Sequence, residues 1–245
     1  MANGIVATNL NMQVGEKKLL DNVSFTVPSG SITVFIGASG AGKTTTIKSV
    51  MNLYMLNSGD IKVCDLDYKD SGLHYKLGYV PEKENFPKMS AWNFLFQMSE
   101  FYDIEREQIS KRIQHYADVL NIGDKLNISL PAMSSGQRKR VMIIQSLIND
   151  PDVLVMDEPT ENLDPDNREV FYKIMEELKK EGKTIFVSTH NLAEFEAYAT
   201  YCVIIAEGKI QHEGPVTKKE GLRKIYDKYR PKLAIEMSGK ILYKD

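Results

Sequence analysis

The chain has 245 residues, 42% of them apolar, which suffices for one large or two small domains with a buried core and argues against disorder. Its 31 basic and 33 acidic side chains give a net charge of −2, so no general attraction to nucleic acid is expected. Cys64 and Cys202 lack CxxC spacing and a nearby histidine cluster, which excludes a disulfide framework and a zinc site.

The sequence contains no signal for membrane insertion. Its first residues lack a basic segment followed by a long apolar run, and no apolar stretch reaches about 18 residues anywhere in the chain. We therefore expect a soluble polypeptide, in a reducing compartment, that cannot cross a membrane by itself.

The first 36 residues predict short strands at 5–10, 23–27 and 31–36, in a mainly antiparallel arrangement. A glycine-rich stretch follows, and then residues 44–56 place Ile47, Val50, Met51 and Tyr54 at helical spacing. The order strand, glycine-rich turn, helix is typical of a loop that binds phosphate groups.

This stretch matches the pattern G-x-x-x-x-G-K-[ST] at every fixed position; it reads Gly37-Ala38-Ser39-Gly40-Ala41-Gly42-Lys43-Thr44. Glycines let backbone N–H groups close around a β-phosphate, and the N-terminus of the helix adds its positive dipole. Lys43 can place a charge on the β- and γ-phosphate oxygens, and the Thr44 hydroxyl suits Mg²⁺. We include Thr45, the next residue, among the expected contacts to ATP.

The middle of the chain changes from strands to helices. Strand segments at 59–64 and 77–82 precede a run of helical spacing from Ala91 to Leu120, which predicts an inserted helical subdomain at about 84–140. The run Arg138-Lys139-Arg140 in the next helix is interpreted as a solvated helix face.

Two further strands complete a parallel sheet. The apolar segment 153–156 ends at Asp157 and Glu158, a helical pattern follows, and strand 184–187 leads to Thr189 and His190. Ligands of such sheets bind beyond the carboxyl ends of the strands. We therefore expect the phosphate loop, the two acidic residues and His190 to meet in one crevice.

The stretch Met133-Ser134-Ser135-Gly136-Gln137 resembles the signature Leu-Ser-Gly-Gly-Gln of ATP-binding cassette (ABC) proteins. With the other motifs, residues 5–215 are similar to the nucleotide-binding subunit of an ABC transporter. The resemblance implies an α/β fold: a phosphate-loop NTPase core with a mainly parallel sheet, an N-terminal antiparallel β subdomain and the inserted helical subdomain. We assign residues 1–215 to this domain and 216–245 to a C-terminal extension without an assigned role.

The resemblance also implies roles for particular residues. Asp157 would hold Mg²⁺ through water, Glu158 would polarise the attacking water, and His190 would contact the γ-phosphate. Ser134, Ser135, Gly136 and Gln137 would close over ATP bound to a second subunit, although by themselves they also fit an ordinary helix cap. Asp164 would cross the same interface, although by itself it also fits a turn before a helix that begins at Pro165. The implied unit is a head-to-tail dimer with two ATP molecules.

Two positions depart from the family pattern. Glu82 stands where most members have a glutamine, so a carboxylate would contact the metal. Val14 stands where an aromatic ring commonly stacks on adenine, so base stacking should be weaker.

The expected function is ATP hydrolysis that powers transport through separate polytopic membrane-spanning subunits, with the chain on the cytoplasmic face of the membrane. Glu82, the signature variant and the chain length resemble ABC-2-type exporters of drugs, peptides or lipids. The alternative is a soluble ABC ATPase acting on ribosomes or DNA, but the chain has one cassette and no heptad array between residues 44 and 133. In the extension, Leu222, Ile225, Tyr226 and Tyr229 predict a helix, and 233–243 a small hairpin.

Overall fold

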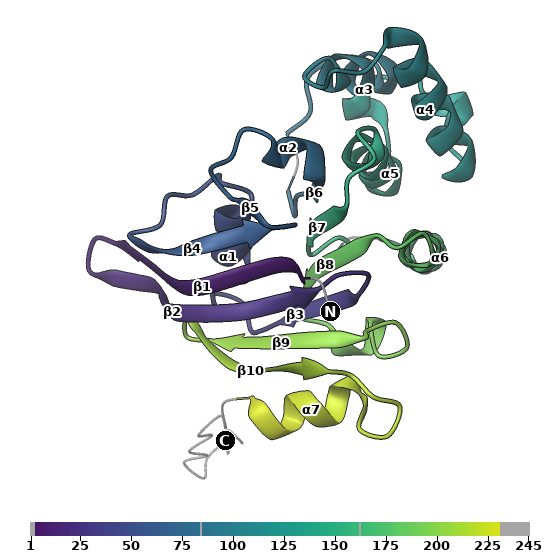
Figure 1. Ribbon diagram of the computed structural model, residues 1–245. Coiled ribbons are helices and arrows are strands. Elements are labelled where there is room, and N and C mark those ends of the chain that lie inside the picture. Colours follow the sequence, from purple (N-terminus) through teal and green to yellow (C-terminus); the bar gives the residue numbers. More distant parts are fainter. Residues whose placement is uncertain (1–2, 84, 162, 231–245) are drawn as a thin grey trace, which may run out of the picture.

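Two β-sheets form the framework of the protein (Figure 1), and the computed structural model describes residues 3–83, 85–161 and 163–230. The smaller sheet is antiparallel, with strand order β2-β1-β4-β5. Its strands are β1 (Asn3–Val14), β2 (Lys17–Pro28), β4 (Ser58–Val63) and β5 (Leu66–Asp67). The predicted antiparallel pairing of the first two strands is confirmed, but β1 and β2 are longer than the sequence indicated. The third predicted strand, 31–36, was wrongly placed with them, since it lies in the larger sheet between parallel neighbours.

The larger sheet has the order β10-β9-β3-β8-β7-β6, and all neighbours are parallel except β10 and β9. Its strands are β3 (Ile32–Ile36), β6 (Leu77–Val80), β7 (Val153–Asp157), β8 (Thr184–Thr189), β9 (Tyr201–Ala206) and β10 (Lys209–Pro215). The predicted mainly parallel sheet is confirmed. The sequence analysis made no prediction for β9 and β10.

The register of the central strands aligns their carboxyl ends. Ile36 of β3 pairs with Thr189 of β8, and Ser188 of β8 pairs with Asp157 of β7. Because β3 leads into the phosphate loop, this pairing places the three predicted motifs at one edge of the sheet.

The helices lie around the larger sheet and beyond its ends (Figure 1). They are α1 (Lys43–Val50), α2 (Leu73–Lys76), α3 (Ala91–Ser99), α4 (Arg106–Val119), α5 (Ser135–Leu147), α6 (Pro165–Lys180) and α7 (Gly221–Tyr229). Short 3₁₀ turns span Gly123–Lys125, Leu130–Ala132 and Leu192–Glu194 (η3). Figure 1 shows α3, α4 and α5 grouped past β6 and β7, whereas α7 lies beyond β10.

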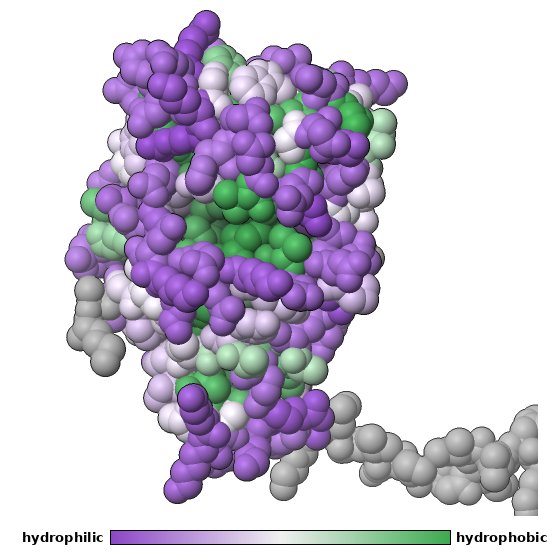
Figure 2. All heavy atoms as spheres, turned by 90° about the vertical axis from the view of Figure 1, so that its right-hand side faces the viewer, coloured by the Kyte–Doolittle hydropathy of each residue, from purple (hydrophilic) through white to green (hydrophobic). Residues whose placement is uncertain are grey.

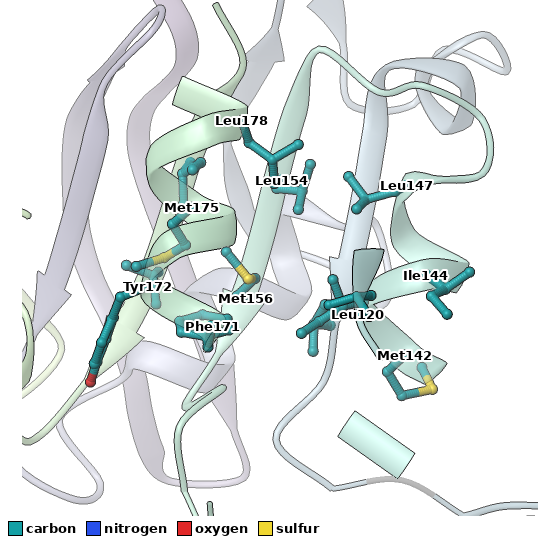
Figure 3. Packing of buried hydrophobic residues seen from close by; sticks show 14 of the residues in the cluster. Leu120, Met142, Ile144, Leu147, Leu154, Met156, Phe171, Tyr172, Met175 and Leu178 are labelled. Atoms are coloured by element: carbon teal, nitrogen blue, oxygen red, sulfur yellow. The ribbon is translucent and has the colours of Figure 1, made fainter. Parts of the chain in front are cut away.

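Two apolar clusters support this framework. One joins the larger sheet to α5, α6 and the helices before them; Figure 3 shows Leu154 and Met156 of β7 facing Phe171 and Met175 of α6. The other lies between the sheets, where the rings of Phe25, Phe35 and Phe186 have centroids 5.3 to 5.6 Å apart. This aromatic group ties β2 of the smaller sheet to β3 and β8 of the larger one.

One predicted helix is shorter than expected. The spacing predicted helix from residue 44 to 56, but α1 ends at Val50. Asn52 adopts a left-handed conformation, with φ of 54°, and its amide bonds the Ser49 carbonyl. Asparagine tolerates this conformation at helix ends, so it stops α1 although the apolar spacing continues.

Figure 2 faces the side that carries α4 and α6 and shows an apolar hollow there. A groove of about 520 Å³ between these helices is lined in part by Tyr116, Leu120, Leu147 and Ile174. The C-terminal helix is confirmed as α7, whereas the predicted hairpin at 233–243 lies outside the described residues. None of the helices in the described ranges has the length and apolar character needed to span a membrane.

The aromatic group between the sheets gives a stability prediction. Phe186→Ala should lower the free energy of unfolding by about 3 to 5 kcal/mol, because the fully buried ring leaves a cavity when removed. Phe101→Ala is the control, since its ring is 76% exposed and the change should stay within about 0.5 kcal/mol. Urea unfolding measures both, and equal effects would refute the assigned role of Phe186.

Candidate functional site

The phosphate loop connects β3 to α1, and its glycines are required for two different reasons. A Cβ on Gly37 would lie 2.5 Å from the Ile205 carbonyl oxygen of β9, so only glycine lets the loop pack against that strand. Gly42, directly before α1, has φ of 113°, a conformation that other residues rarely adopt. The loop therefore presents the N-terminus of α1 at the edge of the sheet.

Lys43, the first residue of α1, points back into the loop. Its ammonium group donates to the Gly37 carbonyl oxygen at 2.8 Å and lies 3.3 Å from Glu158 Oε1. The lysine side chain is only 8% exposed and the glutamate 11%, so solvent screens this ion pair weakly. A carboxylate thus lies against the cation that the sequence assigns to phosphate oxygens.

Glu158 is held in a strained conformation. Its φ of 45° lies in the left-handed region, which is unusual for a residue other than glycine. Its amide donates to Ser188 Oγ at 3.0 Å, and Oε2 lies 2.9 Å from His190 Nδ1. The predicted catalytic residues Glu158 and His190 are therefore in direct contact, with Lys43 on the other carboxylate oxygen.

Asp157 is fully buried at the end of β7. Its Oδ1 accepts a hydrogen bond of 2.6 Å from Ser188 Oγ, whereas Oδ2 has no partner in the described part of the chain. Burial raises the pKa of this carboxyl group, and the hydroxyls of Ser188 and Thr44 act in the opposite direction. A buried carboxylate oxygen without a partner is suited to a metal ion or its bound water.

The donor set here fits Mg²⁺. Thr44 and Glu82 line a pocket at this edge of the sheet, and both act on the pKa of the buried Asp157, so a hydroxyl and a second carboxylate lie near it. Within the described ranges no three acidic, histidine or cysteine side chains could hold a metal by themselves. Mg²⁺ needs no such cluster, because it binds one or two protein oxygens and takes further ligands from phosphates and water.

These groups border a pocket of about 710 Å³, a volume suited to a nucleotide. Predicted residues that line it are Ser39, Gly40, Gly42, Lys43, Thr44, Thr45, Glu82, Glu158 and His190. Six further lining residues were not predicted from the sequence: Lys17, Lys18, Leu19, Glu161, Glu207 and Gly208. Glu207 and Gly208 form the hairpin turn between β9 and β10, and both have a positive φ. The glycine is the one feature of the sequence that could have indicated this turn.

Val14 does not line this pocket, but it lies beside the end that Lys17 lines. It pairs with Lys17 across the turn between β1 and β2, and it is 59% exposed. The walls at this end are formed by Lys17, Lys18 and Leu19, and no aromatic side chain lines the pocket in the described ranges.

Two other predicted groups do not line the pocket. Ser134 caps α5: its hydroxyl accepts from the Gln137 amide at 3.2 Å, and its own amide donates to Gln137 Oε1 at 2.9 Å. Asp164 caps α6 by accepting from the Asn167 amide at 2.8 Å. Within one chain the signature stretch and Asp164 are therefore separate from the phosphate loop.

The run Arg138-Lys139-Arg140 is not the solvated face that the sequence indicated. Lys139 is 5% exposed and donates to the Pro81 carbonyl oxygen at 3.0 Å. Arg140 donates to the Leu120 carbonyl oxygen at 2.9 Å and to the Asn167 side chain. The prediction was wrong because these side chains bridge α5 to neighbouring segments, whose positions no local pattern reveals.

Comparison with known proteins places this geometry in a family. Residues 20–161, more than half of the chain, match the ABC transporter family. The chain belongs to the ABC transporter family. It is an ATP-binding subunit of that family, whose members hydrolyse ATP, and the predicted phosphate-loop NTPase fold is confirmed.

Individual relatives agree with this assignment. A putative ABC transporter ATP-binding protein of Mycoplasma pneumoniae is 35% identical over 81% of the chain, which spans 62% of that relative's length. A Nod factor export ATP-binding protein I of Ralstonia nicotianae is 33% identical over 83% of the chain, and the match spans 68% of that relative's length. The solved structure of an ATP-binding subunit of an ABC transporter has a TM-score of 0.81 at 25% identity, covering 92% of both chains.

The contact between Lys43 and Glu158 predicts an effect on nucleotide affinity. Glu158→Gln should tighten ADP binding without Mg²⁺ by roughly fivefold, about 1 kcal/mol of binding free energy, because it removes the carboxylate that competes with phosphate oxygens for Lys43. The control is Glu161→Gln, which removes the same charge from the pocket lining. Calorimetric titration decides: equal effects of the two variants would mean that the direct contact with Lys43 is unimportant.

Proposed function

We propose that the pocket at the strand ends hydrolyses MgATP and that each predicted residue acts there in its assigned role. The observation that supports this most is the joint position of Lys43, Glu158 and His190, which come from three separate chain segments. Lys43 would bind β- and γ-phosphate oxygens, and His190 would contact the γ-phosphate. Glu158 would then be released from Lys43 and could orient the attacking water.

Asp157, Thr44 and Glu82 would hold Mg²⁺, which supplies charge neutralisation for the phosphate oxygens. The unpartnered Oδ2 atom of Asp157 supports this assignment. The remaining loop residues, Gly37, Ala38 and Ala41, would contribute backbone around the phosphates rather than side chains.

We further propose that two copies, or this chain and a similar one, join head to tail on ATP. Ser134, Ser135, Gly136 and Gln137 lie at the N-terminus of α5, which favours an anion, but they do not line the pocket of their own chain. A second subunit's ATP would give this end of α5 a ligand. Asp164 would then lie at the same interface.

A membrane-spanning subunit is the proposed second partner. Large apolar side chains are exposed just after α1 and α3, where Leu53, Met55 and Phe101 are 59%, 89% and 76% exposed. Leu53 directly follows Asn52 and Phe101 directly precedes Tyr102, and Asn52 and Tyr102 line a cavity of about 380 Å³ between the α1–α2 region and the helical subdomain. We propose this region, called the docking surface below, as the contact for a partner helix.

Export of a drug, peptide, lipid or similar cargo is the proposed direction of transport, with the chain on the cytoplasmic face of the membrane. The names of relatives support export, since several are Nod factor export proteins. The cargo itself would contact the membrane subunit and not this chain.

Hydrolysis tests the proposed chemistry. Glu158→Gln should lower steady-state ATP hydrolysis by roughly 10²- to 10⁴-fold, because water loses its general base, while ATP binding remains. Glu161→Gln, also at the pocket, should leave the rate within about twofold. An unchanged rate in Glu158→Gln would show that another group activates the water.

Partner capture tests the docking surface. Tagged Glu158→Gln chain with ATP should recover a stoichiometric polytopic membrane protein from detergent-solubilised membranes of its source cell. Adding Met55→Glu should abolish that recovery, whereas Val119→Glu, at a residue 55% exposed on α4, should not. Recovery of ribosomes or DNA without a membrane protein would contradict the transporter assignment.

A further inference from the structure

The carboxylate of Glu194 accepts hydrogen bonds from three different segments. Glu194 ends the 3₁₀ turn η3, just after His190, and its side chain is 12% exposed. Its Oε2 accepts from Thr160 Oγ1 at 2.5 Å. Its Oε1 accepts from Arg168 Nη1 and from Asn191 Nδ2, both at 2.8 Å.

Each donor adjoins a part of the reaction site. Thr160 follows Glu158 by two residues and is 4% exposed, while Asn191 is the immediate neighbour of His190. Arg168 lies in the first turns of α6 and also donates through Nε to the Leu163 carbonyl oxygen at 3.0 Å. One carboxylate thus joins the segment after β7, the loop after β8 and the start of α6.

The charge of the carboxylate strengthens this contact. Three donors converge on its two oxygens, one of them a guanidinium, and such charge-assisted hydrogen bonds are about twice as strong as neutral ones. Burial first, and then the negative charge of Glu194, raise the pKa of the neighbouring Tyr172. A glutamine here would keep an oxygen for Arg168 and Asn191, and its amide N–H could pair with the Thr160 hydroxyl, but the charge that meets the guanidinium would be lost.

The loop that carries His190 depends on such an anchor. The His190 side chain is 59% exposed, so packing does little to fix its ring. Its ring nitrogen and its amide both meet Glu158 Oε2, at 2.9 and 3.3 Å. A displacement of the loop after β8 relative to the segment after β7 would therefore change the distance between His190 and Glu158 directly.

We propose that Glu194 is a positioning residue that clamps the loop after β8 to the segment after β7, and so keeps His190 in reach of Glu158 and of the γ-phosphate. The proposal rests on the proposed roles of Glu158 and His190. Through Arg168 and Leu163, the same clamp links this loop to the predicted interface residue Asp164.

The test compares two glutamates of one loop. Glu194→Gln keeps the size of the side chain but removes the charge that Arg168 meets. Glu196→Gln is the control, because Glu196 is exposed and accepts from the Arg223 amide at 2.9 Å, toward α7 and away from the site. We expect kcat for ATP to fall roughly 10- to 100-fold in Glu194→Gln, with the ATP dissociation constant within about twofold, and no such fall in Glu196→Gln.

A second measurement separates positioning from a general loss of structure. In the His190→Ala background, single-turnover hydrolysis of labelled ATP should fall by less than about threefold when Glu194→Gln is added, because the residue acts through His190. Hydrogen exchange should rise together in peptides 158–164 and 188–195 of Glu194→Gln, but not in those of Glu196→Gln.

Three results would overturn the proposal: equal kcat values in both glutamate variants, a loss of ATP affinity as large as the loss of kcat, or the same fall in the wild-type and His190→Ala backgrounds. If the unaltered chain binds ATP and hydrolyses none, the proposed function fails first, and the inference falls with it.

Discussion

The parallel pairing of β3, β8 and β7 is the constraint on which the site depends. Ile36 pairs with Thr189, and Ser188 pairs with Asp157, so the three strands end at one level. A shift of one residue in either pair would reverse which side chains face the nucleotide. The rings of Phe25, Phe35 and Phe186 support β3 and β8 from the smaller sheet. Packing far from the pocket therefore sets the geometry of the chemistry.

At this edge the protein places a carboxylate where a phosphate is expected. Glu158 takes a strained backbone conformation, and its two oxygens meet Lys43 and His190. The strain is compensated by these contacts and by the Ser188 hydroxyl. A γ-phosphate would compete with the glutamate for the same two cationic or hydrogen-bonding partners. In the proposed mechanism, this arrangement would couple arrival of the nucleotide to release of the proposed base, and Glu194 would secure the loop on which that exchange occurs.

Much of this could be predicted from the sequence, because strand ends and phosphate loops have local signals. The apolar run before Asp157 and the complete loop pattern correctly predicted which residues meet at the edge of the sheet. Other features depend on distant segments. Lys139 and Arg140 are bonded to carbonyl groups of Pro81 and Leu120, and Gly208 reaches the pocket because β9 pairs with β3. Asn52 is a residue type that often ends helices, but the predicted helix followed the apolar spacing and ran past it to residue 56.

The most direct measurement is a crystal structure of the Glu158→Gln chain with ATP and Mg²⁺. The account predicts that Lys43 and His190 contact the γ-phosphate, that the metal lies beside Asp157 Oδ2 and Thr44, and that Ser134 of a second copy completes the site. The account would be contradicted if the nucleotide were bound elsewhere. It would also be contradicted if Lys43 still contacted the side chain at position 158 and did not contact the γ-phosphate.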